Sequence, residues 1–385
     1  MPGLDEAGGA SKTGGIMRHS LLLLLALLGG VVSAHAAAPL KRYLYMSTPD
    51  ASQEGGSGKG ILVFDIDDGH KFVKRIDIPF KEGLRGFCGN AKRHAVYYST
   101  TNRRLGAFDV ESEKILWEKQ FDHGVDRACI TPDGKKLYAP TGFWLKTTNS
   151  GFLVVDAENG ELLKRLPAGV AAHNSIASLD GRFAYLGTET NFWIFNTSDD
   201  ALVRQIPNVG ESGVFPFTVD GANRYAYVCL GKHVGFDVVD LKTGETPHRV
   251  FAHDVETRSK LIPHRTHGAG LTPDEKEIWV SDQAGNKLFI FDATSMPPRE
   301  VAHIELGRDG HGWVTFSLDG QYAWCHTPDV IDAKTRKIVA TLKDEKGAPF
   351  CSSKFIEVHF RDGKVVAMGD QFGLGRTSIP ASVTR

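Results

Sequence analysis

Long apolar runs, helical periodicity and charge bias are all scarce in this chain of 385 residues. Past residue 37 no run reaches the ~20 apolar residues that a membrane-spanning helix needs, and none has the 3.6-residue apolar period of an amphipathic helix. Lysine and arginine (45) nearly balance aspartate and glutamate (46), and no basic run appears. These absences predict an almost purely β protein with no membrane span after signal cleavage, and they disfavour nucleic acid as a partner.

The common catalytic signatures are also missing. There is no GxSxG, HExxH or P-loop, and no GxGxxG between a strand and a helix, which disfavours the common hydrolases and nucleotide enzymes. The five cysteines, none in a CxxC pair, are Cys88, Cys129, Cys229, Cys325 and Cys351. An oxidising compartment would permit disulfides, but the odd count leaves at least one cysteine unpaired. For most of them we expect burial as small strand residues.

The first 36 residues predict a secretory signal peptide behind a short disordered extension. Residues 1–16 are rich in Gly, Ala, Ser and Lys and show no periodicity. A short basic region at Met17 to His19 is followed by an apolar run, Ser20 to Val32, and by a small-x-small site that ends at Ala36. The run is short for a membrane anchor, so cleavage is favoured. We therefore expect a periplasmic or extracellular, monomeric protein with a single domain over residues 37–385.

What the chain does contain is a repeat of about 45 residues. A bulky apolar residue followed by Asp or Asn recurs at Phe64-Asp65, Phe108-Asp109, Val155-Asp156, Phe195-Asn196, Val239-Asp240, Phe291-Asp292 and Ile331-Asp332. A turn of the type TPDG or SLDG recurs at 131–134, 178–181, 218–221, 272–275, 317–320 and 361–363. An Asp side chain can bond backbone N–H groups two or three residues on and so close such a turn. Seven copies with four strand signals each predict an all-β, seven-bladed β-propeller of four-stranded blades.

Six of the repeats are complete, and the seventh must combine the two ends of the chain. The complete units span approximately 84–119, 126–166, 174–206, 213–252, 268–304 and 312–342. In the closing blade the first strand is predicted at Phe355 to Phe360, and either Tyr43 to Ser47 or Lys364 to Gly369 supplies the second. Pairing the N- and C-terminal strands in one blade would close the ring and remove open sheet edges.

The candidate site lies where the first strands begin, because these strands line the central channel of a propeller. The residues just before or in them are Arg85, Asp126, Arg127, His173, Asn174, Gly213, His267 and His311, with Glu357 on the closing blade. They are candidates for recognition of an anionic group, or for acid–base catalysis by a histidine next to Arg85 or Arg127. A divalent metal (zinc, copper or iron) on His173, His267 and His311, with Glu357 or Asp126, is a further hypothesis. Alternatively, these side chains bond backbone carbonyls near the channel and do no chemistry.

Other histidines and aromatic residues have simpler interpretations. His123, a few residues upstream of Asp126, could reach the rim of the channel, whereas His70 stands in a predicted turn and is expected to be solvated. Phe143 lies in a longer loop between strands, where it could mark a partner surface or pack over its blade. Trp313 and Trp324 are expected in the core between blades.

The best-developed repeat, HGAGLTPDEKEIWVSDQAGNKLFIFD from His267 to Asp292, resembles the repeats of the YVTN-type β-propeller family. DRACITPDGKKLYAP (126–140) and HGWVTFSLDGQYAW (311–324) match less closely. The resemblance covers Lys41 to Gly375 and implies a secreted seven-bladed propeller. Similar propellers include surface-layer-like proteins, companions of periplasmic quinoprotein dehydrogenases, lactonases of the phosphogluconolactonase type, and domains of cytochrome- and copper-dependent oxidoreductases.

Together these patterns predict a periplasmic propeller that binds a ligand, a metal or a periplasmic protein partner at its axial mouth. The alternative is an enzyme dependent on a metal or on His and Arg, either a lactonase-like hydrolase or an oxidoreductase component. A purely structural scaffold is the third hypothesis. Gly213 stands where other blades have His or Asp, which argues against a fully symmetric metal ring.

Overall fold

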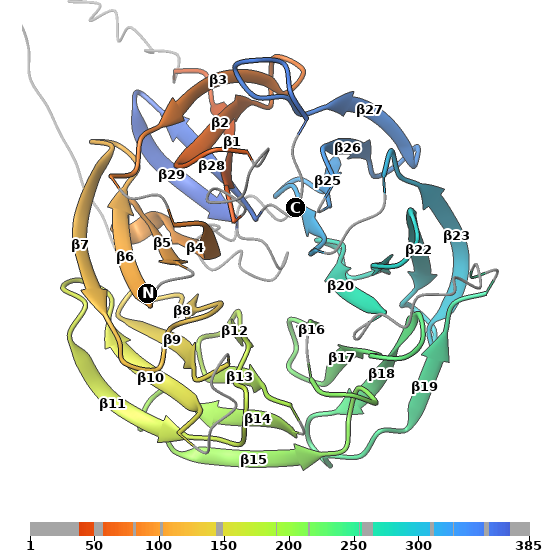
Figure 1. Ribbon diagram of the computed structural model, residues 1–385. Helices are drawn as coiled ribbons and strands as arrows, with labels where there is room; N and C mark the ends of the chain where they lie inside the picture. Colours follow the sequence, from red (N-terminus) through yellow and green to blue (C-terminus); the bar gives the residue numbers. More distant parts are fainter. Residues whose placement is uncertain are drawn as a thin grey trace, which may run out of the picture. The chain divides into compact units, whose positions relative to one another are not determined.

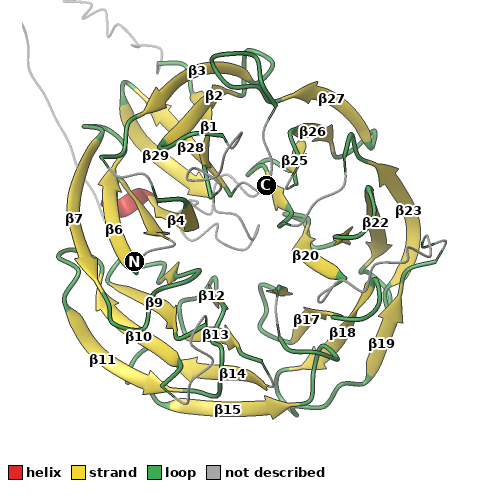
Figure 2. Cartoon of the chain, in the orientation of Figure 1, coloured by secondary structure: helices red, strands yellow, loops and turns green. Residues whose placement is uncertain are grey.

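The computed structural model describes residues 38–49, 57–79, 82–100, 103–143, 149–189, 191–214, 216–253, 255, 265–308, 312–325, 327–349 and 354–369. These residues form seven antiparallel sheets in a ring (Figure 1), which confirms the predicted seven-bladed all-β propeller. In the described part of the chain the helical content is the 3₁₀ turn Ala91–Arg93 (Figure 2). No helix among the residues described is long and apolar enough to cross a membrane. The predicted signal peptide, residues 1–36, lies outside the described residues.

Six blades consist of four consecutive strands each. In chain order they are β4 (Leu84–Asn90), β5 (Ala95–Thr100), β6 (Arg104–Asp109) and β7 (Lys114–Gln120); β8 (Cys129–Ile130), β9 (Lys136–Thr141), β10 (Gly151–Asp156) and β11 (Leu162–Pro167); β12 (Asn174–Ala177), β13 (Phe183–Gly187), β14 (Asn191–Asn196) and β15 (Leu202–Pro207); β16 (Phe217–Val219), β17 (Tyr225–Cys229), β18 (Gly235–Asp240) and β19 (His248–Phe251); β20 (Thr266–Leu271), β21 (Glu277–Asp282), β22 (Lys287–Asp292) and β23 (Arg299–Glu305); β24 (Thr315–Phe316), β25 (Tyr322–Trp324), β26 (Asp329–Asp332) and β27 (Lys337–Thr341). The first strand of each blade lies toward the axis and the fourth forms the rim of the ring (Figure 1). The predicted blade spans agree with these ranges to within a few residues.

The seventh blade joins the two ends of the chain. β28 (Phe355–Arg361) pairs with β1 (Lys41–Ser47), and β2 (Ile61–Asp65) and β3 (Lys71–Ile76) complete the sheet outward. β1 therefore takes the second-strand position, which settles the choice that the sequence left open. β29 (Lys364–Gly369) pairs with the other edge of β28, so this blade has five strands rather than the predicted four.

Burial explains the sequence pattern of the strands. The third strands carry unbroken apolar runs, as in β22 (KLFIFD), because neighbouring blades pack against both faces of a blade. The fourth strands alternate, as in β23 (REVAHIE), because they lie at the rim with one side exposed. Trp324 shows the packing between blades: it is fully buried in a cluster with Leu44 and Phe64 of the closing blade, as the sequence predicted.

The Asp or Asn that ends each third strand closes the turn to the fourth strand, as predicted. Asp156 Oδ1 accepts hydrogen bonds from the backbone N–H groups of Glu158 (2.7 Å) and Asn159 (3.2 Å). Asp240 Oδ1 makes the equivalent pair of bonds at 2.8 Å each. Because this bond joins residues two or three apart, it does not depend on contacts between blades. The turn, and with it the repeat, can therefore be recognised from a short stretch of sequence.

The described cysteines, Cys88, Cys129, Cys229 and Cys325, are all buried as thiols in four different blades. Burial raises the pKa of the Cys325 thiol to about 11. A thiol that stays protonated at neutral pH is a poor nucleophile and packs as a small apolar group. This agrees with the expectation from sequence, while Cys351 lies outside the described residues.

His70 corrects a prediction, because its place in the turn between β2 and β3 had indicated a solvated side chain. The residue is 5% exposed, and its ring lies against Tyr322 and Trp324 with centroids 4.7 and 5.8 Å apart. The two aromatic residues belong to the neighbouring blade, so local sequence gives no sign of them. Burial and the charge of nearby Arg42 lower the pKa of His70 to about 4.

Acidification should therefore weaken the fold through His70. The unfolded chain binds a proton there below about pH 6.5, whereas the folded protein resists it until about pH 4. Above about pH 6.5 neutral His70 therefore makes its full contribution to the free energy of unfolding. Roughly 3 kcal/mol of that free energy is lost as the pH falls to about 4. Guanidinium unfolding should show His70→Asn losing this part of the pH dependence, because Asn tolerates the left-handed backbone (φ 60°) and does not titrate. Equal pH slopes for both proteins would contradict the assignment.

Candidate functional site

Two of the predicted site residues are presented by β-bulges in first strands. Arg85 in β4 and His267 in β20 are each skipped in the pairing with the second strand. A bulge leaves one residue unpaired and re-aims its side chain. Each is followed by a glycine, Gly86 or Gly268, at which a Cβ would lie 2.7 or 2.1 Å from a backbone carbonyl oxygen of the next blade. The Arg-Gly and His-Gly pairs therefore combine a redirected side chain with close approach of the neighbouring blade.

Serine hydroxyls near the ends of second strands fix the backbone around the site. Ser99 Oγ accepts a hydrogen bond from the Gly86 N–H (2.9 Å) and donates to the carbonyl oxygen of Asp126 (2.7 Å). In the closing blade, Ser47 Oγ accepts from the Lys354 N–H at 3.2 Å. The segments that enter the channel are thus held by rigid sheet rather than by loop contacts alone.

Asp126, Arg127 and His173 form one connected group. Arg127 Nη1 donates to Asp126 Oδ1 at 2.8 Å and lies 3.1 Å from His173 Nε2. His173 Nδ1 lies 3.0 Å from Asn174 Oδ1, an atom that can only accept. This assigns the proton to Nδ1 and leaves Nε2 to accept from Arg127, so His173 is neutral. Consistently, burial and the adjacent Arg127 lower the pKa of His173 well below its usual value.

Among the residues that the structure describes, the cluster holds more basic than acidic groups. Arg85 Nε lies 3.5 Å from Asp126 Oδ1, so one buried carboxylate faces two guanidinium groups. Burial raises the pKa of Asp126, but Arg127 and Arg85 outweigh it and hold that pKa below its usual value. Lys354 is 2% exposed and lies near the same two arginines. Its burial, and then the positive charges of Arg127 and Arg85, lower the pKa of Lys354 well below its usual range.

Trp313 forms an aromatic surface within this cluster. The guanidinium carbon of Arg127 lies 5.0 Å and Nζ of Lys354 lies 5.4 Å from the centroid of its ring. The rings of His173 and His267 are 6.3 and 5.6 Å from it. Both basic side chains are therefore within the range of cation–π attraction to one indole. The sequence had assigned Trp313 to the core between blades; it is buried as expected and belongs to the site as well.

The structure therefore brings together most of the predicted site residues, namely Arg85, Asp126, Arg127, His173, Asn174 and His267. It adds two that the sequence did not single out, Lys354 and Trp313. Phe143, noted as a loop aromatic, packs its ring edge-on against His173 at a centroid distance of 4.4 Å. Lys354 could have been found from its place directly before the first strand of the closing blade, the position that Arg127 and His173 occupy near theirs.

Glu357, a predicted metal ligand, points elsewhere. Its two carboxylate oxygens accept hydrogen bonds from the Leu318 backbone N–H and from His359 Nε2, both at 2.6 Å. His173 Nε2 accepts from Arg127 and so offers no lone pair to a cation. In the described ranges no group of three His, Cys, Asp or Glu side chains is arranged to hold a metal ion. His311 lies outside those ranges, so the metal hypothesis remains a prediction to which the rest of the geometry gives no support.

Three buried polar atoms of the cluster have no hydrogen-bond partner among the residues described. They are Arg127 Nε, Asn174 Nδ2 and Asp126 Oδ2. Buried polar groups in proteins are nearly always bonded to protein, water or ligand, because desolvation without a partner is unfavourable. Two open donors and one open acceptor in one connected group of side chains indicate a place for a polar molecule.

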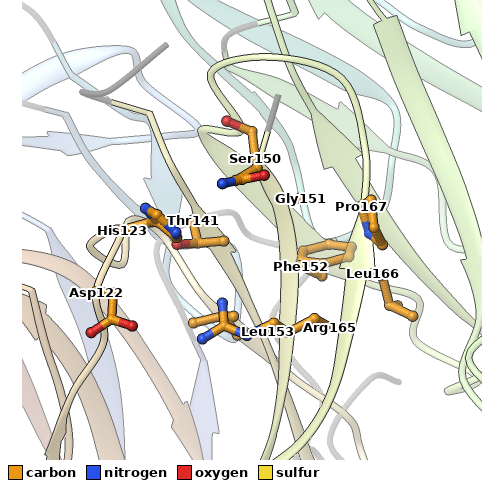
Figure 3. Close-up of a pocket in the computed structure, with 11 residues that line it drawn as sticks. Asp122, His123, Thr141, Ser150, Gly151, Phe152, Leu153, Arg165, Leu166 and Pro167 are labelled. Atoms are coloured by element: carbon orange, nitrogen blue, oxygen red, sulfur yellow. The ribbon is translucent and has the colours of Figure 1, made fainter. Parts of the chain in front are cut away.

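A cleft lies between strands of the β8–β11 blade, apart from the axial cluster (Figure 3). This cleft of about 360 Å³ is lined by Asp122, His123, Thr141 and Arg165, among others. His123, which the sequence predicted near the axial rim, lines this cleft beside Thr141. Its charged residues Asp122 and Arg165 are exposed, whereas Asp126, Arg127 and Lys354 of the axial cluster are buried. The axial cluster is therefore the stronger candidate site.

Comparison with known proteins adds the fold and little else. No family model matches the sequence, and no curated protein does so either. Among solved structures, Kuenenia stuttgartiensis hydrazine synthase is similar, with a TM-score of 0.55 and 16% identity over 69% of this chain and 81% of that chain. At this identity the similarity supports the propeller fold alone, so the YVTN-type assignment remains a prediction from the repeats.

Proposed function

We propose that this propeller binds a small anionic molecule, with a carboxylate or phosphate group, at the cluster on its axis. The observation that carries the proposal is the balance of charge among the described residues: the buried Arg127 and the partly buried Arg85 both lie beside the carboxylate of Asp126. An anion seated on the open Arg127 Nε would balance the second guanidinium and bond a donor that is otherwise unsatisfied. The planar guanidinium fork suits both carboxylate and phosphate.

A small molecule fits this cluster better than a protein partner does. Asp126, Arg127, His173 and Lys354 are each exposed by 4% or less, out of reach of a flat protein surface. Trp313 adds an apolar face of the kind that small-molecule sites combine with a few polar groups. The apolar run at residues 20–32 and the small-x-small site at Ala36 support a periplasmic or extracellular location for this binding.

Arg85→Met should weaken anion binding by about tenfold to a hundredfold. A hydrogen bond to a charged group contributes about 1.5–3 kcal/mol, and this variant leaves the Asp126–Arg127 pair intact. Isothermal titration of the mature protein with inorganic phosphate and with pyruvate measures the effect. Arg93→Met, which removes an arginine of the 3₁₀ turn paired with Glu158, is the matched control and should bind like the wild type. Equal affinities for the two variants, or no binding of either anion, would refute the proposal.

A further inference from the structure

We propose that Lys354 is an amine nucleophile that forms an imine with the bound molecule, whose class is then a 2-oxo acid. The inference rests on the proposed function, because the arginines would hold the carboxylate of such a ligand. The inference goes beyond anion binding in two respects. It names Lys354 as a reactive group of the protein, and it requires a carbonyl next to the carboxylate of the ligand.

The surroundings of Lys354 favour its neutral form. The side chain is buried, as is that of Arg127, and Asp126 already lies 2.8 Å from Arg127 and 3.5 Å from the partly buried Arg85. An ammonium group placed there would be desolvated beside two guanidinium groups that share one carboxylate. Burial and these two charges hold the pKa of Lys354 far below its ordinary range. A lysine desolvated and next to other cations is the form in which this residue attacks carbonyl carbons.

The backbone holds Lys354 in place for such a role. Its N–H donates to Ser47 Oγ at 3.2 Å, and its carbonyl oxygen accepts from the Ser47 N–H at 2.9 Å. The residue therefore stands directly before β28, held by two hydrogen bonds to the end of β1. Its Nζ and the Arg127 guanidinium carbon lie over the same ring of Trp313, at 5.4 and 5.0 Å from the centroid. Arg127 and Lys354 thus both border the ring of Trp313, and in the proposed complex the carbonyl next to a carboxylate bound by Arg127 is turned toward Lys354.

The reaction balances without an oxidant or reductant. The nitrogen lone pair forms a bond to the carbonyl carbon, and the C=O π pair moves to oxygen. One amine proton transfers to that oxygen and gives a carbinolamine. Uptake of one further proton expels the oxygen as water, and the nitrogen lone pair forms the C=N bond of a protonated imine. Asp126 Oδ2, which has no hydrogen-bond partner in the described part of the chain, is the acceptor available to carry the first proton.

Reductive trapping tests the inference on the full mature chain. Protein is incubated with pyruvate and cyanoborohydride at neutral pH, and the modified lysines are identified by peptide mass spectrometry. Each unit by which a lysine pKa is lowered gives up to about tenfold more amine at neutral pH, so Lys354 should be labelled at least about tenfold faster than surface lysines. Lys354→Met should abolish the fast labelling. Lys276→Met, which removes an exposed lysine beside Asp274, should keep it.

Acetaldehyde, which lacks a carboxylate, is the matched probe. Selective trapping of pyruvate over acetaldehyde at Lys354 supports the whole inference, whereas equal rates would overturn the 2-oxo acid class. Equal labelling of Lys354 and surface lysines, while calorimetry still detects pyruvate binding, would overturn the imine and leave anion binding in place. Absence of both labelling and binding would overturn the proposed function itself. The wild-type experiment decides these outcomes even where Lys354→Met does not fold.

Discussion

Exchanging Ile356 for aspartate is expected to unfold the entire ring. Ile356 is fully buried in β28, the strand that joins the C-terminal segment to β1. Its side chain packs toward the next blade, where a Cβ at Gly89 would lie 3.4 Å from Ile356 Cγ2. A carboxyl group at this point has to be desolvated without a partner, and the burial of an isoleucine is lost as well. Together these amount to about 5 kcal/mol or more, comparable to the whole stability of many domains.

The control for this change lies on the same strand. Arg361→Asp introduces the same group at the exposed end of β28, where surface substitutions change stability by about 0.5 kcal/mol or less. Guanidinium unfolding followed by circular dichroism compares the two. Because the blades of a propeller support one another in a circle, the aspartate at 356 should remove the cooperative transition of the whole protein. A folded Ile356→Asp protein with nearly normal stability would show that β28 does not close the ring.

The second large effect is expected at Asp126. Asp126→Asn removes the carboxylate that Arg85 and Arg127 share, so the buried guanidinium of Arg127 and the partly buried one of Arg85 lose this counter-charge. Breaking a buried ion pair by removal of one partner destabilises proteins by about 3–5 kcal/mol. Asp68→Asn, at an exposed ion pair with Lys71, is the matched control and should change stability by less than about 1 kcal/mol.

Anions should rescue Asp126→Asn more than they stabilise the wild type. Phosphate can occupy the place of the lost carboxylate, and a ligand at 100 times its Kd stabilises a protein by about 2.7 kcal/mol. Urea unfolding with and without inorganic phosphate, at equal ionic strength set by chloride, measures this difference. A variant as stable as the wild type, or one that phosphate leaves unchanged, would show that the carboxylate does not balance the two arginines.

The sequence predicts the architecture well because its signals are local. The Asp of each third strand bonds the turn that follows it, and the strands on either side follow from burial between blades. The same regularity located Arg85, Asp126, Arg127, His173 and His267, since each stands at the start of a first strand. In a ring of blades the first strands all lie toward the axis, so residues at the start of these strands come close together.

What the sequence could not supply are the contacts that the ring creates between distant residues. The place of Lys354 directly before a first strand puts it near the axis, but its burial beside Arg127 and Trp313 cannot be read from its own segment. Glu357 looked available on a first strand, but the Leu318 backbone and His359 bind its carboxylate. His70 reads as a solvated turn residue until the neighbouring blade covers it.

The fifth strand of the closing blade changes how the ring would come apart. If the closing blade had four strands, β28 would pair with β1 alone. Detachment of β1 would then leave β28 with no neighbouring strand. Here β28 remains in a hairpin with β29 through the turn at Asp362 and Gly363 when β1 separates. The edge of β28 that pairs with β1 therefore stays ordered. When the N-terminal strand β1 detaches, it can pair again with this ordered edge, and the two ends of the chain do not both have to refold first.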